Sequence, residues 1–302
     1  MRRYLRVLGV TLSVLVGGLV TITATGYALG MVEAANHDIY EYQRAKLSSD
    51  EPFDVVFVGD SSLGNAIGAT LFTKLSGLAT ANLALNGSYG SGGAYNMVRK
   101  VLDRHPPRLI VVMLSIDTMR RDEAFPGFYF SAEPRQLLTA SPVRILELYF
   151  SLKTARRVVE QIWKRGLATA PTRFDGDYVA QTERLADPSL ELDAHPLLPN
   201  MVAQAQLDYL ARIAQACNAQ GVTCVYAHGP IYEGYCHQAV QYVERLDAGI
   251  RDSGLDVVSG TPVCMARDDV GNSIDHVRPD LKEAYTRRYV ELLGSWLGRA
   301  AQ

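Results

Sequence analysis

The sequence predicts an α/β fold in which helices cover a five-stranded parallel sheet. Short apolar runs rich in β-branched residues alternate with segments of helical period, which is the pattern of strands buried on both faces. The expected strands are residues 54–59, 79–85, 109–114, 222–226 and 255–258, and the expected helices are residues 67–75, 94–105, 201–220, 239–253 and 280–297. This order predicts a flavodoxin-like three-layer α/β/α sandwich.

The chain opens with a stretch free of charge, residues 7–31, that is long enough to cross a bilayer as a helix. Arg2, Arg3 and Arg6 precede it, so the positive-inside rule places this end in the cytoplasm. We therefore expect residues 1–34 to form a single-pass anchor in a bacterial inner membrane, residues 35–52 a stalk, and residues 53–302 a periplasmic domain. A cleaved signal peptide is the alternative, because residues 32–34 weakly resemble a cleavage site.

Composition and charge exclude several classes of function. The 302 residues are 48% hydrophobic, and 30 basic residues face 32 acidic ones, so the chain can bury a core and offers no basic field for nucleic acid. The glycine-rich residues 90–93 lack the lysine of a phosphate-binding loop, and no G-x-G-x-x-G follows a strand. A nucleotide-dependent enzyme is not expected, nor is any cofactor or metal.

The four cysteines lie in the last third of the chain, an even number that suits disulfides in an oxidising compartment. Cys217 and Cys224 flank a short helix-to-strand turn, and Cys236 and Cys264 follow the ends of neighbouring predicted strands. We predict these two pairs. Free buried thiols are the alternative, and a metal site is less favoured because no C-x-x-C pair occurs.

The alternation of strands and helices fails between residues 123 and 200. An aromatic cluster, residues 125–130, is followed by an amphipathic stretch, residues 141–165. We expect a helical insertion here. It would either cap an edge of the sheet or form a lid or a surface for a membrane partner.

Polar residues follow the predicted strands, where ligands bind in open α/β sheets. Ser61 follows the first strand and Gly87 the second, while His276 precedes the last helix. A serine hydroxyl needs a base to take its proton, and an acyl-transfer site needs N–H donors for the oxyanion. Ser61 is thus the expected nucleophile and His276 the base. His228, after the fourth strand, is expected to line the pocket or position the substrate.

Three segments resemble the sequence blocks of the SGNH (GDSL-like) hydrolase superfamily. Residues 55–61 end in Gly-Asp-Ser, residues 82–87 are Asn-Leu-Ala-Leu-Asn-Gly, and residues 276–279 are His-Val-Arg-Pro. The resemblance implies that Ser61 is the nucleophile, that the Gly87 N–H helps to hold the oxyanion and that His276 is the base. It covers roughly residues 53–122 and 201–297.

Two positions depart from the pattern of that superfamily. Asp117 stands where the third block usually presents an asparagine near the oxyanion, and Ser273 stands where the acid usually lies, three residues before the histidine. Asp275 is therefore the expected partner of the His276 ring, with Asp269 and Asn272 as alternatives. The alternative to a catalytic site as a whole is that Ser61 only caps a helix and His276 is an ordinary surface residue.

The resemblance and the anchor together imply a serine acyltransferase that moves acetyl or another acyl group onto a cell-surface polysaccharide, beside a membrane-bound O-acyltransferase. The same site could hydrolyse such esters instead. A non-catalytic assembly or binding protein on the same scaffold is the third alternative, because fold alone does not define activity.

Overall fold

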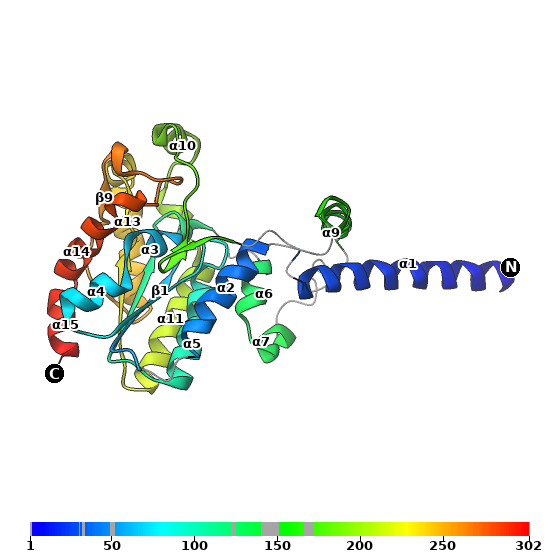
Figure 1. Cartoon of the computed structure of the whole chain (residues 1–302), viewed down its shortest axis with the longest axis horizontal. Coiled ribbons are helices and arrows are strands. Elements are labelled where there is room, and N and C mark those ends of the chain that lie inside the picture. The colour runs from blue at the N-terminus through cyan, green and yellow to red at the C-terminus, as the bar shows by residue number, and fades with distance from the viewer. Residues whose placement is uncertain are drawn as a thin grey trace. The chain divides into compact units, whose positions relative to one another are not determined.

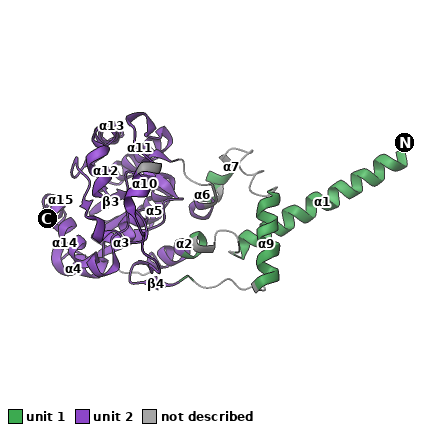
Figure 2. Ribbon diagram, turned by 90° about the horizontal axis from the view of Figure 1, so that it is seen from above, with its two compact units in different colours: residues 1–38, 132–172 green, residues 39–131, 173–302 purple. Residues whose placement is uncertain are grey.

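The computed structural model (Figure 1) describes residues 2–29, 31, 34–48, 52–121, 125–139, 151–165 and 172–301. The chain forms two compact units, which Figure 2 colours separately. We call residues 1–38 and 132–172 the anchor unit, and residues 39–131 and 173–302 the sheet unit. The expected insertion is therefore divided, because its middle belongs to the anchor unit and its two ends belong to the sheet unit.

The sheet unit contains a parallel sheet with the strand order β2-β1-β3-β6-β8. Its strands are β1 (Val55–Gly59), β2 (Thr80–Ala84), β3 (Leu109–Leu114), β6 (Thr223–His228) and β8 (Asp256–Val257). Every residue of β1, β2 and β3 is buried, which explains why these segments are apolar without a break. The predicted five-stranded parallel sheet is confirmed, with each strand within two residues of its expected ends.

Two groups of helices pack against this sheet. Helix α5 (Gly90–Arg104) contacts β1, β3 and α11 (Gln204–Ala219), and α13 (Val240–Asp252) contacts α11 and β8. In the other group, α4 (Ala69–Ser76) contacts β2 and α14 (Lys282–Leu292), while α3 (Ser61–Ala66) contacts β1. The expected last helix is interrupted at Leu293, after which α15 (Gly294–Ala300) follows.

Helix α2 (Ala34–Lys46) occupies most of the segment expected to be a stalk. Ile39 and Tyr40 are buried in the core of the sheet unit. The Gln43 amide nitrogen donates hydrogen bonds to the carbonyl oxygens of Ala84 (2.8 Å) and Asp177 (3.0 Å). The second half of α2 is therefore an integral part of the sheet unit, held by buried polar contacts that its hydrophilic composition does not reveal.

The expected helical insertion contains both helices and strands. Its helices are α6 (Phe125–Ser131), α7 (Pro134–Thr139), α9 (Leu152–Arg165) and α10 (Pro188–Ala194). Strands β4 (Phe174–Asp175) and β5 (Tyr178–Val179) form an antiparallel hairpin in the sheet unit. Gly176, the first of the two turn residues, has a φ of +57°. That conformation favours glycine, so the turn dipeptide Gly176-Asp177 is the sequence signal for this hairpin.

Short elements complete the sheet unit: the 3-10 turns η1 (Thr118–Arg120), η2 (Pro199–Met201), η3 (Arg267–Asp269) and η4 (Pro279–Leu281), the helix α12 (Glu233–Gln238) and the parallel strand pair β7 (Ile231–Tyr232) and β9 (Cys264–Met265). The chain between β9 and α14 is mostly irregular and carries the predicted histidine.

Helix α1 (Arg2–Ala28) dominates the anchor unit. Among the described residues it is the one helix long and apolar enough to cross a membrane, a test that a signal sequence would also pass. Its Thr21 and Thr23 hydroxyls donate to the carbonyl oxygens of Gly17 and Leu19. Both threonine hydroxyls are therefore hydrogen-bonded within the helix, as polar groups in an apolar environment must be.

Both predicted disulfides are present. Cys217–Cys224 joins the end of α11 to β6, and Cys236–Cys264 joins α12 to β9. Disulfides persist in oxidising compartments. Together with the apolar helix α1, they are the features of a membrane or secreted protein.

Candidate active site

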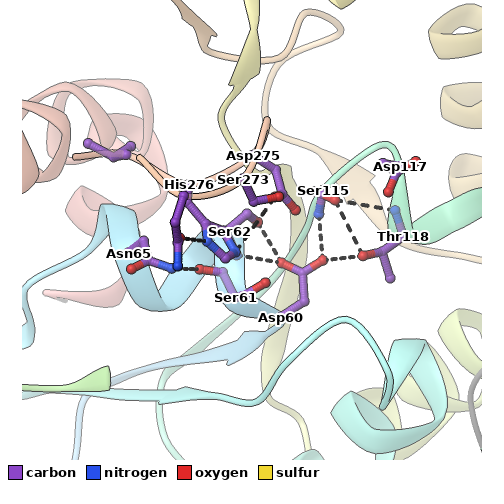
Figure 3. A network of polar contacts seen from close by, with 12 residues as sticks. Asp60, Ser61, Ser62, Asn65, Ser115, Asp117, Thr118, Ser273, Asp275 and His276 are labelled. Carbon is purple, nitrogen blue, oxygen red and sulfur yellow. Dashed lines mark hydrogen bonds and ion pairs between the residues drawn. The ribbon is translucent and has the colours of Figure 1, made fainter. Parts of the chain in front are cut away.

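Several of the polar residues singled out in the sequence lie at the carboxyl end of the sheet (Figure 3). Asp60, Ser61 and Ser62 follow β1, and Ser115 and Thr118 follow β3. The loop 271–278 approaches from between β9 and α14. Figure 3 draws these side chains together and marks the hydrogen bonds that join Asp60 to Ser62, Ser115 and Thr118.

The Asp60 carboxylate is the centre of this network. Its Oδ1 accepts hydrogen bonds from the Ser62 backbone nitrogen (3.0 Å) and hydroxyl (2.6 Å). Its Oδ2 accepts from the Ser115 nitrogen (2.9 Å) and the Thr118 hydroxyl (2.6 Å). Burial and then the charge of Asp275 raise the pKa of the Asp60 carboxyl, against these hydrogen bonds, which lower it. Asp60 thus ties the end of β1 to the end of β3.

Ser61 and Ser62 differ in what their hydroxyls can do. The Ser62 side chain is buried, its hydroxyl bonds to Asp60, and a Cβ on Gly229 would lie 2.0 Å from its Oγ. Ser61 is only half-buried and is the first residue of α3. The N-cap of that helix is Asp60, which accepts from the Ser62 nitrogen, so Ser61 does not serve as a helix cap. Of the two serines, Ser61 is the more exposed, and its side chain interacts with the Tyr178 hydroxyl.

The His276 ring is held through its Nδ1 atom. Nδ1 lies 2.7 Å from Asn272 Oδ1, and because an amide oxygen can only accept, the geometry favours a proton on Nδ1. The Nε2 atom is then the basic nitrogen. It lies 3.6 Å from Asp275 Oδ1, which is beyond hydrogen-bond distance.

The contact expected of Asp275 is therefore made by Asn272. Asp275 is buried and its Oδ1 accepts from the Ser273 hydroxyl at 2.6 Å. The His276 backbone nitrogen donates a hydrogen bond to the Ser273 carbonyl oxygen (3.0 Å). The turn that this bond closes places Asp275 near the Nε2 atom of His276. Asp269, the other acid considered, accepts from the Tyr285 hydroxyl at 2.8 Å.

Gln181 connects α3 to the loop 271–278 that carries His276, which we call the histidine loop. Its Nε2 donates to Asn65 Oδ1 and to the Val277 carbonyl oxygen, each at 2.7 Å, and its Oε1 accepts from the Asn272 nitrogen at 3.2 Å. Asn65 in turn donates to the Ser61 carbonyl oxygen at 2.8 Å. Gln181 is not among the predicted site residues, because it lies in the insertion and its partners are remote in the chain.

Tyr178 is the second residue of the insertion that reaches the site. Its ring covers Gly64 of α3, where a Cβ would lie 2.2 Å from the ring, and its hydroxyl donates to the Leu85 carbonyl oxygen at 2.8 Å. Burial, followed by the charges of Asp60 and Asp275, raises the pKa of Tyr178 well above its usual value, while interaction with Ser61 opposes the rise. The β4–β5 hairpin therefore supplies one wall of the site.

Gly87 lies beside the network, whereas Asp117 and His228 face other partners. A Cβ on Gly87 would lie 3.4 Å from the Thr118 hydroxyl. Asp117 forms ion pairs with Arg120 and Arg121, and Figure 3 shows it on the far side of Thr118 from Ser61. The buried His228 ring has its Nε2 2.7 Å from Asp247 Oδ1.

A cavity of about 130 Å³ adjoins the histidine loop. Asn272 and Ser273 form one side of it, and Asp117, Arg120 and Arg121 form another. Leu185, His195 and Ile274 complete its lining. A small polar group bound there would lie next to the residue that holds His276 and would meet two guanidinium groups.

No known protein-family model matches the chain, and neither does any curated protein. Within the described part of the chain, no group of three or more His, Cys, Asp or Glu side chains is arranged to hold a metal ion.

Proposed function

We propose that the chain is a membrane-anchored serine acyltransferase of the SGNH hydrolase superfamily, which moves an acetyl or similar group onto a cell-surface polysaccharide. The observation that carries the proposal is the combination of a partly exposed Ser61, at the turn from β1 to α3, with a histidine whose Nδ1 is already hydrogen-bonded. The sheet with its two groups of helices would then be a flavodoxin-like three-layer α/β/α sandwich.

In the first half-reaction, Ser61 Oγ attacks the acyl carbonyl carbon while His276 Nε2 takes the hydroxyl proton. The donor's leaving group departs with that proton, and the acyl group remains on Ser61 as an ester. In the second half-reaction, a sugar hydroxyl attacks this ester and gives its proton to His276, which returns it to Ser61 Oγ. The backbone N–H groups of Ser61 and Gly87 are the proposed donors to the oxyanion in both steps.

The remaining side chains of the site would position these groups. Asp60 holds the turn that carries Ser61, and Asn272 fixes the proton of His276 on Nδ1. The cavity beside Asn272 is the proposed entry for the acceptor. Since Asp117 lines that cavity and pairs with Arg120 and Arg121, we assign it to acceptor binding rather than to the oxyanion.

In this proposal α1 crosses a bacterial inner membrane with Arg2, Arg3 and Arg6 on the cytoplasmic side, and the sheet unit lies in the periplasm. The two disulfides support an oxidising compartment. A membrane-bound O-acyltransferase is the proposed source of the acyl group, because a tethered acceptor enzyme can meet a donor delivered through the membrane.

The test is to incubate the full chain with p-nitrophenyl acetate, with and without an oligosaccharide acceptor, and to follow acylated sugar and free acetate together. Transfer predicts an acyl-enzyme and a sugar ester whose yield rises with acceptor at the expense of acetate. Release of acetate alone, whatever the acceptor, would indicate an esterase. Neither acyl-enzyme nor product would indicate an assembly or binding protein, and Ser61→Ala is the control for uncatalysed transfer.

A further inference from the structure

Helix α9 has two chemically distinct faces. Placed on a helical projection, Leu152, Ala155, Val158, Val159, Ile162 and Trp163 fall within one arc, and the charged residues occupy the opposite side. The helix carries five basic residues and one acidic residue, a net charge of +4. Basic amphipathic helices with a tryptophan on the apolar face are typical of the membrane surface.

The protein covers only part of this apolar face. Ala155 and Val158 are buried, with exposed fractions of 8% and 1%. Leu152, Val159 and Trp163 lie along the same face, yet 76%, 49% and 90% of their surface is exposed. A continuous exposed strip of this kind marks a surface that meets another apolar phase.

The depth of α9 follows from its packing against α1 within the anchor unit. A bilayer core takes about 20 helical residues, so a core that begins at Val7, after the arginines, ends near Gly26. The buried residues of α1 are Thr23, Gly26 and Tyr27, and Figures 1 and 2 both draw α9 beside this end of the helix. Helix α9 therefore meets α1 at the level of the lipid headgroups.

We infer that α9 is an interfacial helix, lying in the bilayer surface opposite the Arg2 end of α1. Its Leu152–Val159–Trp163 strip inserts among the acyl chains, and Lys153 and Lys164 contact anionic phospholipid headgroups. Charge complementarity and continuity with the exposed apolar surface of α1 select lipid as the occupant. This inference rests on the membrane anchor of the proposed function, but not on the chemistry at Ser61.

The chain offers a direct probe, because Trp163 and Trp296 are its two tryptophans. Trp296→Phe leaves Trp163 as the single indole, and Trp163→Phe leaves Trp296 as the matched control. Each full-length variant is placed in nanodiscs of phosphatidylcholine, with or without phosphatidylglycerol. Lipids brominated near the headgroup or deep in the acyl chain then report contact with the indole by quenching its fluorescence.

We expect Trp163 to be quenched by the shallow bromines more than by the deep ones, and more strongly when phosphatidylglycerol is present. Trp296 should remain unquenched. Replacing Leu152 and Val159 together by Gln should reduce quenching of Trp163, since the strip can then no longer insert.

Three results would overturn the inference: a Trp163 that no bromolipid quenches, stronger quenching by the deep bromines, or quenching independent of lipid charge. Labelling of Ser61 by a fluorophosphonate in the same nanodiscs reports separately on the proposed chemistry. Mass measurement of the purified chain shows whether α1 is retained. A missing quenching signal caused by loss of α1 can then be told apart from one caused by an α9 that does not lie in the bilayer surface.

Discussion

The two halves of the candidate site are held in different ways. On the side of Ser61, the proposed nucleophile, the buried Asp60 carboxylate accepts four hydrogen bonds from residues at the ends of two central strands. On the histidine side, a half-buried ring is held by one hydrogen bond to an exposed Asn272, on an irregular loop. The nucleophile side is thus part of the folded core, whereas the histidine side can be altered without unfolding the protein.

The largest effect that this comparison predicts is for His276→Ala. The variant should fold, because the ring lies on an irregular loop and the substitution removes one hydrogen bond, that to Asn272, while the rate of Ser61 acylation should fall by roughly 10⁴-fold or more. Burst kinetics with p-nitrophenyl acetate and thermal unfolding of the same sample measure the two quantities. A folded His276→Ala variant that acylates at the normal rate would remove His276 from the mechanism.

Next in size is the contrast between Asn272 and Asp275. Asn272→Ala frees the ring and should cost roughly 10²-fold in acylation, as small misplacements of catalytic groups do, and Asp275→Asn should cost less. Asn272→Asp keeps an oxygen acceptor of the same shape against Nδ1. Its acylation rate, measured by the same burst kinetics, should therefore stay within a few-fold of that of the unmodified chain. A larger loss for Asp275→Asn than for Asn272→Ala would make Asp275 the orienting group.

Ser61 and Asn272 differ in how far the sequence could place them. The location of Ser61 was predictable because it lies two residues after the apolar strand β1, and strands of a parallel sheet end at one edge. Asn272 was only one of several candidates, since its position depends on loop hydrogen bonds such as that from the Gly271 nitrogen to the His276 carbonyl oxygen. No periodicity in a sequence encodes such a turn.

Gln181→Ala tests whether the two halves are coupled. Losing the bonds that join Asn65 to the histidine loop should lower kcat about tenfold, equivalent to one or two net hydrogen bonds, with a smaller change in KM. Gln204→Ala, an exposed glutamine whose amide nitrogen bonds to Asp208 one turn along its own helix, is the matched control. Equal activity of the two variants would mean that the halves are positioned independently.

Gln181 and Tyr178 also explain why the site could not be completed from sequence. Both lie in the segment interpreted as a helical insertion, and their partners are Asn65, Val277 and Leu85, about 90 to 120 residues away. Asp117 is a different case, because the arginines three and four residues later are a visible signal for local ion pairs. Their spacing in the sequence by itself argues against an oxyanion role for Asp117.

The smallest effect on rate is expected on the nucleophile side. Thr118→Val keeps the shape of the side chain but removes one donor to Asp60, so the free energy of unfolding should fall by about 1–3 kcal/mol. Acylation by the protein that remains folded should change only a few-fold. Thr70→Val, at an exposed position of α4, is the control. A Thr118→Val variant of normal stability that no longer acylates would contradict the comparison, because Thr118 would then act on the chemistry and not on the folded core.

The most direct test of the central claim is to find where an acyl-like reagent attaches. The full chain is treated with a fluorophosphonate, and the labelled peptide is mapped by mass spectrometry. Because Ser61 is partly exposed while the hydroxyl of the buried Ser62 bonds to Asp60, we predict a single adduct on Ser61 that is lost in Ser61→Ala and strongly slowed in His276→Ala. An adduct on Ser62, or labelling that survives Ser61→Ala, would contradict the account.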